Sequence, residues 1–185
     1  MTQQSPLLIG LSAVMVAVEA DAPRVLITQR ESGEDALPFG AFDPDRHRTF
    51  DLSLRGWVRE QTGFELGYVE QLYTFGDKDR ETPEATLAGA APNARVISVG
   101  YLALTPEARP AGDSFEARWQ SWYRYFPWED HRCGRPAILD AHISPRLMTW
   151  AAGNEQRLER ARAAFALDGA RWIEERVLDR YELLY

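Results

Sequence analysis

The sequence contains a single cysteine and a single lysine among 185 residues, Cys133 and Lys78. One cysteine cannot form an internal disulfide or a cysteine-based metal site, and its isolation agrees with a reducing cytoplasm. Long apolar runs are also missing. The closest approach, Leu7–Val18, is interrupted by Gly10 and Ser12 and falls short of the roughly 18 residues of a membrane span. It has neither the basic start nor the cleavage pattern of a secretory signal, so we expect a cytoplasmic protein with no membrane partner.

An excess of positive charge is absent as well. The formal net charge is −7, and the arginines are scattered among acids, as in Arg160 and Arg162 beside Glu159. A domain that binds nucleic acid through the phosphates usually shows a basic excess or a basic stripe. This chain by itself is therefore a poor candidate for DNA binding.

What is present is the composition of a folded domain. Hydrophobic residues make up 45% of the chain and charged residues 26%, which argues against disorder. A chain of this length is enough for one α/β domain with a short helical extension.

Several apolar segments have the pattern of strands. Arg95–Leu104 is almost continuously apolar, which is typical of a central buried strand. Leu7–Val18 and Arg24–Gln29 are apolar runs with β-branched residues, Tyr68–Phe75 alternates, and Trp119–Phe126 is aromatic. The predicted strands are Leu7–Val18, Arg24–Gln29, Tyr68–Phe75, Arg95–Leu104 and Trp119–Phe126.

Three segments have the spacing of helices. The first contains Leu52, Leu54 and Val58, with Thr49 or Asp51 available as N-cap and Gly63 as the stop. The second is expected to start at Ser144-Pro145 and to carry an apolar stripe as far as Phe165. The third is expected from about Asp168, with Ile173, Val177, Tyr181 and Leu184 on one face.

These patterns predict a core domain over residues 1–143 and a helical extension over residues 144–185. The last helix runs to Leu184 and Tyr185 without a glycine, asparagine or proline to end it. We therefore expect the chain to be a piece of a longer protein that continues into another domain.

Short motifs in the core resemble the Nudix family. Arg59–Phe64 resembles the end of the Nudix box, G-x5-E-x7-R-E-U-x-E-E-x-G-U with U apolar, and Leu37–Phe42 resembles the Leu-Pro-Gly-Gly segment that opens it. Tyr68–Asp77 and Arg95–Tyr101 resemble the branch that contains ADP-ribose pyrophosphatases and NrtR-type regulators of NAD metabolism. The resemblance implies an α/β/α Nudix sandwich with a mixed sheet, followed by C-terminal helices.

The box has lost most of its carboxylates in this sequence. Nudix hydrolysis needs divalent metal to neutralise charge on the pyrophosphate and to activate a water molecule, and Mg²⁺ prefers oxygen ligands. Aligned on Gly63, the sequence has Gly56 at the motif arginine and Trp57, Glu60 and Gln61 at the three helical glutamates. With Glu60 alone remaining, we expect no catalytic residues, no metal and no cofactor.

The resemblance implies a ligand-sensing domain, similar to the effector half of NrtR-type regulators. Its ligand would be a nucleotide effector such as ADP-ribose, and it would act as a homodimer. It would reach DNA only through a winged-helix domain that this chain does not contain. The candidate ligand-binding residues are Arg30, Phe39, Gly40, Phe42, Arg55, Glu60, Tyr73, Phe75 and Asp77.

Two other readings stay open from the sequence. The first is an active, Mg²⁺-dependent Nudix hydrolase of ADP-ribose or a related nucleoside diphosphate derivative, in which Glu60 works with a loop carboxylate. The loop candidates are Glu84, Glu107, Asp113 and Glu116. The second is an interaction domain that binds no nucleotide. Individual residues also have plainer explanations, with Trp57 in the core and His47 as an ordinary loop histidine.

Overall fold

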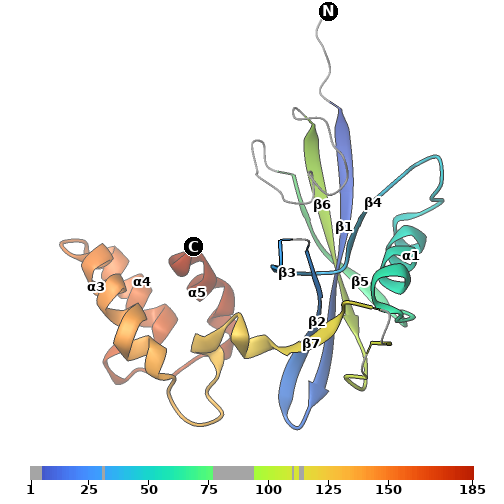
Figure 1. Ribbon diagram of the computed structural model, residues 1–185. Coiled ribbons are helices and arrows are strands. Elements are labelled where there is room, and N and C mark those ends of the chain that lie inside the picture. Colours follow the sequence, from blue (N-terminus) through green and yellow to red (C-terminus); the bar gives the residue numbers. More distant parts are fainter. Residues whose placement is uncertain (1–5, 31, 77–93, 110, 113–114) are drawn as a thin grey trace, which may run out of the picture. The chain divides into compact units, whose positions relative to one another are not determined.

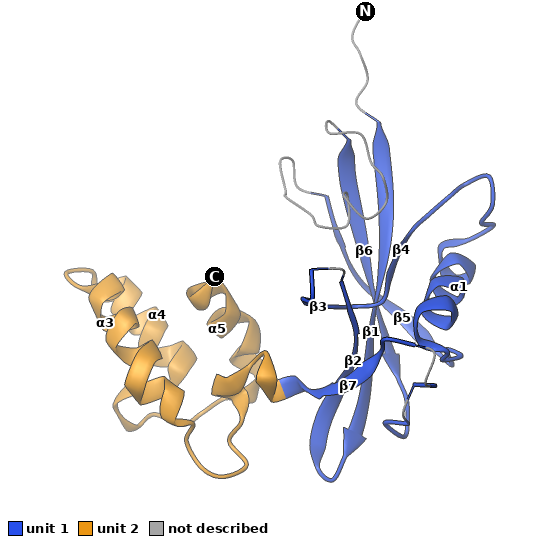
Figure 2. Cartoon of the chain, viewed as in Figure 1, with its two compact units in different colours: residues 1–122 blue, residues 123–185 orange. Residues whose placement is uncertain are grey.

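The computed structural model describes residues 6–30, 32–76, 94–109, 111–112 and 115–185 (Figure 1). The chain forms two compact units, Met1–Trp122 and Tyr123–Tyr185 (Figure 2). From the sequence we predicted a boundary between residues 143 and 144, whereas the compact units divide between residues 122 and 123. The segment between these two positions belongs to the second unit because Trp128 is buried in its helical core.

In the first unit, the described residues form a mixed sheet of seven strands. Its main path runs β3-β2-β1-β6-β5, with β4 paired to β1 and β7 paired to β2. The β1–β6 pair is parallel and the other pairs are antiparallel. The strands are β1 (Leu7–Glu19), β2 (Ala22–Gln29), β3 (Asp35–Ala36), β4 (Phe39–Ala41), β5 (Val69–Phe75), β6 (Arg95–Leu104) and β7 (Arg118–Ser121).

The two longest strands, β1 and β6, lie side by side at the centre of this sheet (Figure 1). The central position was predicted for β6 from its apolar sequence. Helix α1 (Phe50–Thr62) packs on them through Leu54 and Val58, which are buried together with Leu11 and Met15. The predicted caps of this helix are confirmed. The side chain of Thr49 accepts a hydrogen bond from the backbone of Leu52, and Gly63 ends the helix at φ 72°.

The second unit is helical. It contains α3 (Ser144–Ala151), α4 (Glu155–Phe165) and α5 (Val177–Leu184), with a π-helix at Leu139–Ile143 and short 3-10 turns. Its core buries Trp128, Leu139, Ile143, Leu147, Ala161, Ala164, Phe165 and Leu167. The expected α/β class, mixed sheet and C-terminal helices are thus all present. In the part of the chain that the structure describes, no helix is long and apolar enough to cross a membrane.

Some predicted boundaries are wrong. The strand expected to reach Phe126 ends at Ser121 and gives way to a 3-10 turn. Helix α3 begins at Ser144 with a proline in its first turn, as expected, but the π-helix runs directly into it, and the stripe to Phe165 is divided between α3 and α4. The last helix begins at Val177 instead of Asp168, since Asp168 and Gly169 adopt positive φ angles of 58° and 81° that interrupt helical geometry.

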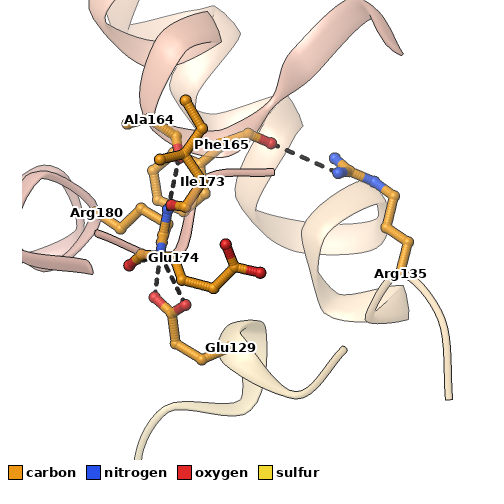
Figure 3. A network of polar contacts seen from close by, with 7 residues as sticks. All are labelled: Glu129, Arg135, Ala164, Phe165, Ile173, Glu174 and Arg180. Carbon is orange, nitrogen blue, oxygen red and sulfur yellow. Dashed lines mark hydrogen bonds and ion pairs between the residues drawn. The ribbon is translucent and has the colours of Figure 1, made fainter. Parts of the chain in front are cut away.

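A buried arginine anchors the last helix (Figure 3). The guanidinium of Arg180 is fully buried and donates to both carboxylate oxygens of Glu129, at 2.7 and 2.9 Å. It also donates to the carbonyls of Ala164, Ile173 and Glu174 at 2.9–3.1 Å. Of the apolar stripe predicted for this helix, Leu184 packs against the core, whereas Ile173, Val177 and Tyr181 are exposed, with 46% exposure at Tyr181. The polar contacts of Arg180 therefore hold α5 in addition to apolar ones.

Candidate functional site

The first unit contains a cleft of about 660 Å³ at one end of α1. The end of β2, the β4 segment, the last turns of the helix and the chain just before β7 form its walls. The lining residues are Thr28, Gln29, Arg30, Ala36, Leu37, Phe39, Gly40, Ala41, Trp57, Glu60, Gln61, Phe115 and Glu116. A volume of this size is within the ordinary range for small-molecule sites.

Two side chains of α1 are hydrogen-bonded to the backbone of β4. The indole nitrogen of Trp57 donates to the carbonyl of Ala41 at 3.0 Å. The side-chain oxygen of Gln61 accepts from the backbone nitrogen of Phe39 at 3.0 Å, and its amide nitrogen donates to the carbonyl of Phe39. We call these contacts the α1–β4 clamp. Trp57 and Gln61 are the two residues that the alignment on Gly63 places at expected carboxylate positions of the Nudix motif.

Gly40 lets the clamp close. A Cβ atom at this position would lie 2.1–2.2 Å from three ring atoms of Trp57, far inside van der Waals contact. The indole ring therefore lies directly against the backbone of β4. The glycine is required for this close approach and not for an unusual backbone angle, because its φ is not positive.

The residues around the clamp do not fit a metal centre. Glu60 is exposed at the cleft, between the two clamp residues of the helix. Within the described ranges, no group of three or more histidine, cysteine, aspartate or glutamate side chains is placed to hold a metal ion. Two divalent ions close together require several oxygen ligands, and the indole of Trp57 and the engaged amide of Gln61 do not supply them.

Arg30 contributes positive charge to the cleft. Its side chain is 23% exposed, and its buried Nε has no hydrogen-bond partner within the described residues. Within the described residues, the guanidinium of Arg30 forms one ion pair, a long one of 3.9 Å from Nη1 to the exposed carboxylate of Glu34. Arg30 is the arginine among the described residues that line the cleft.

Four of the residues predicted to bind ligand are brought together in this cleft: Arg30, Phe39, Gly40 and Glu60. Arg55 is placed elsewhere. It forms a 2.9 Å ion pair with Asp51 and donates to the carbonyls at positions 66 and 67, so that it holds the turn after α1.

Three other predicted residues, Phe42, Tyr73 and Phe75, do not line the cleft. Phe42 makes an edge-on ring contact with Phe50, with centroids 4.6 Å apart. Tyr73 and Phe75 lie on β5 and contact each other at 4.9 Å. Asp77 lies outside the described residues.

His47 orders the loop before α1. Its Nδ1 accepts a hydrogen bond from the backbone nitrogen of Asp43 at 3.1 Å and lies 3.1 Å from the hydroxyl of Ser53. Because a backbone N–H can only donate, Nδ1 carries no proton in this arrangement. His47 is thus a loop histidine, and its ring is held by the backbone of Asp43 and the hydroxyl of Ser53.

Among the loop carboxylates considered for catalysis, Glu116 lines the cleft. Glu107 is paired with Arg109 at 2.9 Å and lies outside the cleft, while Glu84 and Asp113 lie outside the described residues. Sequence reasoning did not select Phe115 as a lining residue. Nothing local marked it, because the fold alone brings residue 115 next to the far end of α1.

The arrangement of the first unit, with the β1–β6 parallel pair, the flanking antiparallel strands and α1 against them, is the Nudix fold. The NUDIX domain of Shewanella oneidensis NrtR complexed with ADP ribose is similar to this chain, with a TM-score of 0.53 and 20% identity over 68% of this chain and 79% of that one. No family model matches the sequence, and no curated protein matches it significantly.

Two longer proteins show the same likeness. Shewanella oneidensis NrtR has a TM-score of 0.52 and 20% identity, over 64% of this chain and 53% of that chain. A MutT/nudix family protein from Enterococcus faecalis has a TM-score of 0.51 and 26% identity, over 65% and 46%. This chain therefore spans about half the length of these two proteins.

Proposed function

We propose that this chain is a non-catalytic, Nudix-like nucleotide-sensing domain that binds ADP-ribose or a related NAD metabolite in the cleft. The observation that carries the proposal is the α1–β4 clamp. Trp57 and Gln61 stand where a hydrolase needs carboxylates, and both are engaged with the backbone of β4. The cleft nevertheless stays open, and Arg30 is among its lining residues.

The likeness to NrtR supports the choice of ligand and of biological role. The Shewanella NUDIX domain was solved in complex with ADP ribose. By the same resemblance, the chain would be the effector part of a transcriptional regulator of NAD metabolism and would act as a homodimer. Its formal net charge of −7 is unfavourable for direct contact with DNA phosphates. DNA binding would therefore require a further domain.

Ligand binding is tested by calorimetry and by thermal shift, with ADP-ribose, NAD, nicotinamide mononucleotide and ATP in the presence of a chelator. Binding to the native state raises the unfolding temperature by mass action. At least one of these compounds should bind without metal, and Arg30→Gln should weaken it. Arg109→Gln, an exposed arginine outside the cleft, is the matched control. No heat and no stabilisation from any compound at millimolar concentration would overturn the proposal.

The rival function is a metal-dependent hydrolase, and one observation favours it: Glu60 and Glu116 line the same cleft. The test is to incubate the purified chain with ADP-ribose and Mg²⁺ or Mn²⁺ and to follow AMP by chromatography. We expect no turnover above background. Turnover near 1 s⁻¹, the low end of common enzyme rates, that is lost in Glu60→Gln would establish the hydrolase instead.

A further inference from the structure

Strand β5 is an edge of the sheet with little of the usual protection against pairing with another chain. Among the described residues, β6 pairs with one side of β5 and no strand pairs with its other side. Natural sheets usually shield such an edge with lysine, proline or several charges. The sequence of β5, VEQLYTF, contains no lysine and no proline and carries one charge, at Glu70. The free side of this strand is therefore suited to a second strand.

Large apolar side chains are exposed along the same strand. Six of the seven residues of β5 are exposed, including Leu72 at 52%, Tyr73 at 64% and Phe75 at 39%. The rings of Tyr73 and Phe75 contact each other, with centroids 4.9 Å apart. An exposed apolar edge strand is a template for pairing with another chain. Both the backbone and the side chains of β5 thus favour an interface.

A bulge in β5 divides its side chains between the two faces of the sheet. Gln71 pairs with Tyr101, which belongs to the core beneath α1, whereas Tyr73 pairs with Gly100, the preceding residue of β6. Successive residues of a strand point to opposite faces. Gln71 is therefore on the α1 face, and Tyr73 and Phe75 are on the other face.

A second copy of the chain supplies a strand that matches this pattern. Residues directly opposite each other in an antiparallel pair share one face of the sheet. A two-fold axis perpendicular to the sheet at Thr74 meets this condition, because it sets Tyr73 of each copy opposite Phe75 of the other. An axis at Leu72 would instead set Gln71 opposite Tyr73, which are on different faces. The bulge thus selects the second half of β5 for pairing.

The side chains suit the register centred at Thr74. It sets the two copies of Thr74 opposite each other and brings four aromatic rings together, and both kinds of cross-strand pair are stabilising. Glu70 lies outside the paired segment, so its two copies are not opposed. Because this match needs no second sequence, it favours another copy of the chain over an unrelated peptide.

We propose that two copies of this chain pair through the second half of β5, Tyr73–Phe75, and form one continuous sheet across a two-fold axis. The inference rests on the proposed function for the homodimer alone, to which it gives a surface. It does not depend on what the cleft binds.

The size and the charge of this interface define how tightly the copies bind. An aromatic side chain buries about 150–250 Å² when fully covered, so four partly exposed rings supply a few hundred Å². Stable interfaces bury about 1,200–2,000 Å², and this dimer should therefore dissociate on dilution. Each copy has a net charge of −7. Salt screens the repulsion between the copies and should strengthen their association.

Analytical ultracentrifugation of the purified chain between micromolar and millimolar concentration measures the dissociation constant of the dimer. Thr74→Lys sets two like charges opposite each other and should raise this constant at least tenfold, as should Tyr73→Ser. The matched control is Tyr68→Ser, because Tyr68 is 81% exposed but lies before β5. It should change the constant less than threefold. Circular dichroism checks that each variant is folded.

Cross-linking locates the axis. The variants are made in a Cys133→Ser background, which removes the exposed native thiol. A short bis-maleimide should join copies of Thr74→Cys at least tenfold faster than copies of Glu70→Cys. In the proposed register, the two Glu70 positions are offset by eight residues, or about 26 Å at about 3.3 Å per residue.

The outcomes separate this inference from the rest of the proposed function. A monomer at every concentration would overturn both the β5 pairing and the homodimer, while nucleotide binding is decided by calorimetry on the cleft. A dimer that Thr74→Lys and Tyr73→Ser leave unchanged would overturn the β5 assignment and keep the homodimer. Equal rates of cross-linking at positions 70 and 74 would overturn it as well.

Discussion

The side-chain amide of Gln61 pairs with the backbone of Phe39 in both directions, accepting from its nitrogen and donating to its carbonyl. An amide can do both at once, whereas an ionised carboxylate can only accept. The helix position is thus suited to joining α1 to β4 and, in the same measure, unsuited to holding a metal ion.

Gln61→Glu should therefore destabilise the first unit. The new carboxylate would face the carbonyl of Phe39 without a proton to donate, and an unsatisfied polar group of this kind costs about 1–3 kcal/mol. Urea unfolding at pH 7 measures the loss. Glu60→Gln, one residue earlier and exposed, should change stability by no more than about 0.5 kcal/mol. Equal effects of the two changes would show that the pairing with Phe39 contributes nothing.

Two glycine substitutions should have opposite effects. Gly40→Ala places a Cβ against the Trp57 ring, and such overpacking typically costs about 1–3 kcal/mol. Gly56→Ala, within α1, meets no atom within 4 Å and should stabilise by about 0.5–1 kcal/mol, because alanine favours a helix. Thermal unfolding of both variants makes the comparison. Combining Gly40→Ala with Trp57→Leu should cost less than the sum of the two single changes.

Removing the Arg180 guanidinium should destabilise the second unit strongly. Arg180→Met leaves the carboxylate of Glu129, 12% exposed in the folded chain, without its partner, and breaking a buried pair in this way costs about 3–5 kcal/mol. The control is Arg160→Met, because Arg160 and Glu182 form a 2.8 Å pair that is at least half exposed. Exposed pairs contribute about 0–1 kcal/mol. The free energy of unfolding is measured with denaturant and circular dichroism. An equal loss of this free energy in both variants would contradict the prediction.

His131 should make the stability of the second unit depend on pH. Burial lowers the pKa of its imidazole below the ordinary 6.5, and Arg135 and Arg180 lower it further while Glu129 opposes them. The ring lies 4.1 Å from that of Trp172. The imidazole of His131 binds a proton more readily in the unfolded chain than in the folded one. Its contribution to the free energy of unfolding is therefore fully present above pH 6.5 and is lost as the pH falls below that value.

The measurement compares unfolding free energies at pH 7.5 and pH 5.5. The loss between these values should be smaller in His131→Gln than in the unmodified chain, whereas His142→Gln, at an exposed position, should keep it. A loss of the same size in His131→Gln would assign the pH dependence to other groups.

Local chemistry explains which parts of this fold could be predicted from the sequence. The caps at Thr49 and Gly63 were predictable because they depend on side chains within a few residues of the helix ends. Both β1 and β6 were predicted as strands, and β6 as a central buried one, because their sequences are apolar along their length. The Nudix-box alignment singled out Trp57, Glu60 and Gln61, and all three line the cleft.

What could not be predicted depends on residues far apart in the chain. The apolar stripe of the last helix pointed to Ile173, Val177, Tyr181 and Leu184 as its buried face, and of these Leu184 packs against the core. The fully buried residue is Arg180, whose partner Glu129 is 51 positions earlier. In the same way, no local pattern places Phe115 beside Gln61 in the cleft. The spacing of hydrophobic residues predicts which face of a helix is buried, but it does not predict a single buried ion pair on another face.

The α1–β4 clamp disfavours single substitutions that would bring carboxylates to its helix positions. From the present sequence, a return to three helical carboxylates requires changes at both Trp57 and Gln61. Either change alone would release one attachment of β4, and the helix would still be short of one carboxylate. Proteins are only marginally stable, by about 5–15 kcal/mol, so each intermediate would lose stability before it gained a metal ligand. Changes that tune the cleft, for example at Arg30 or Glu116, face no such barrier, because neither residue belongs to the clamp.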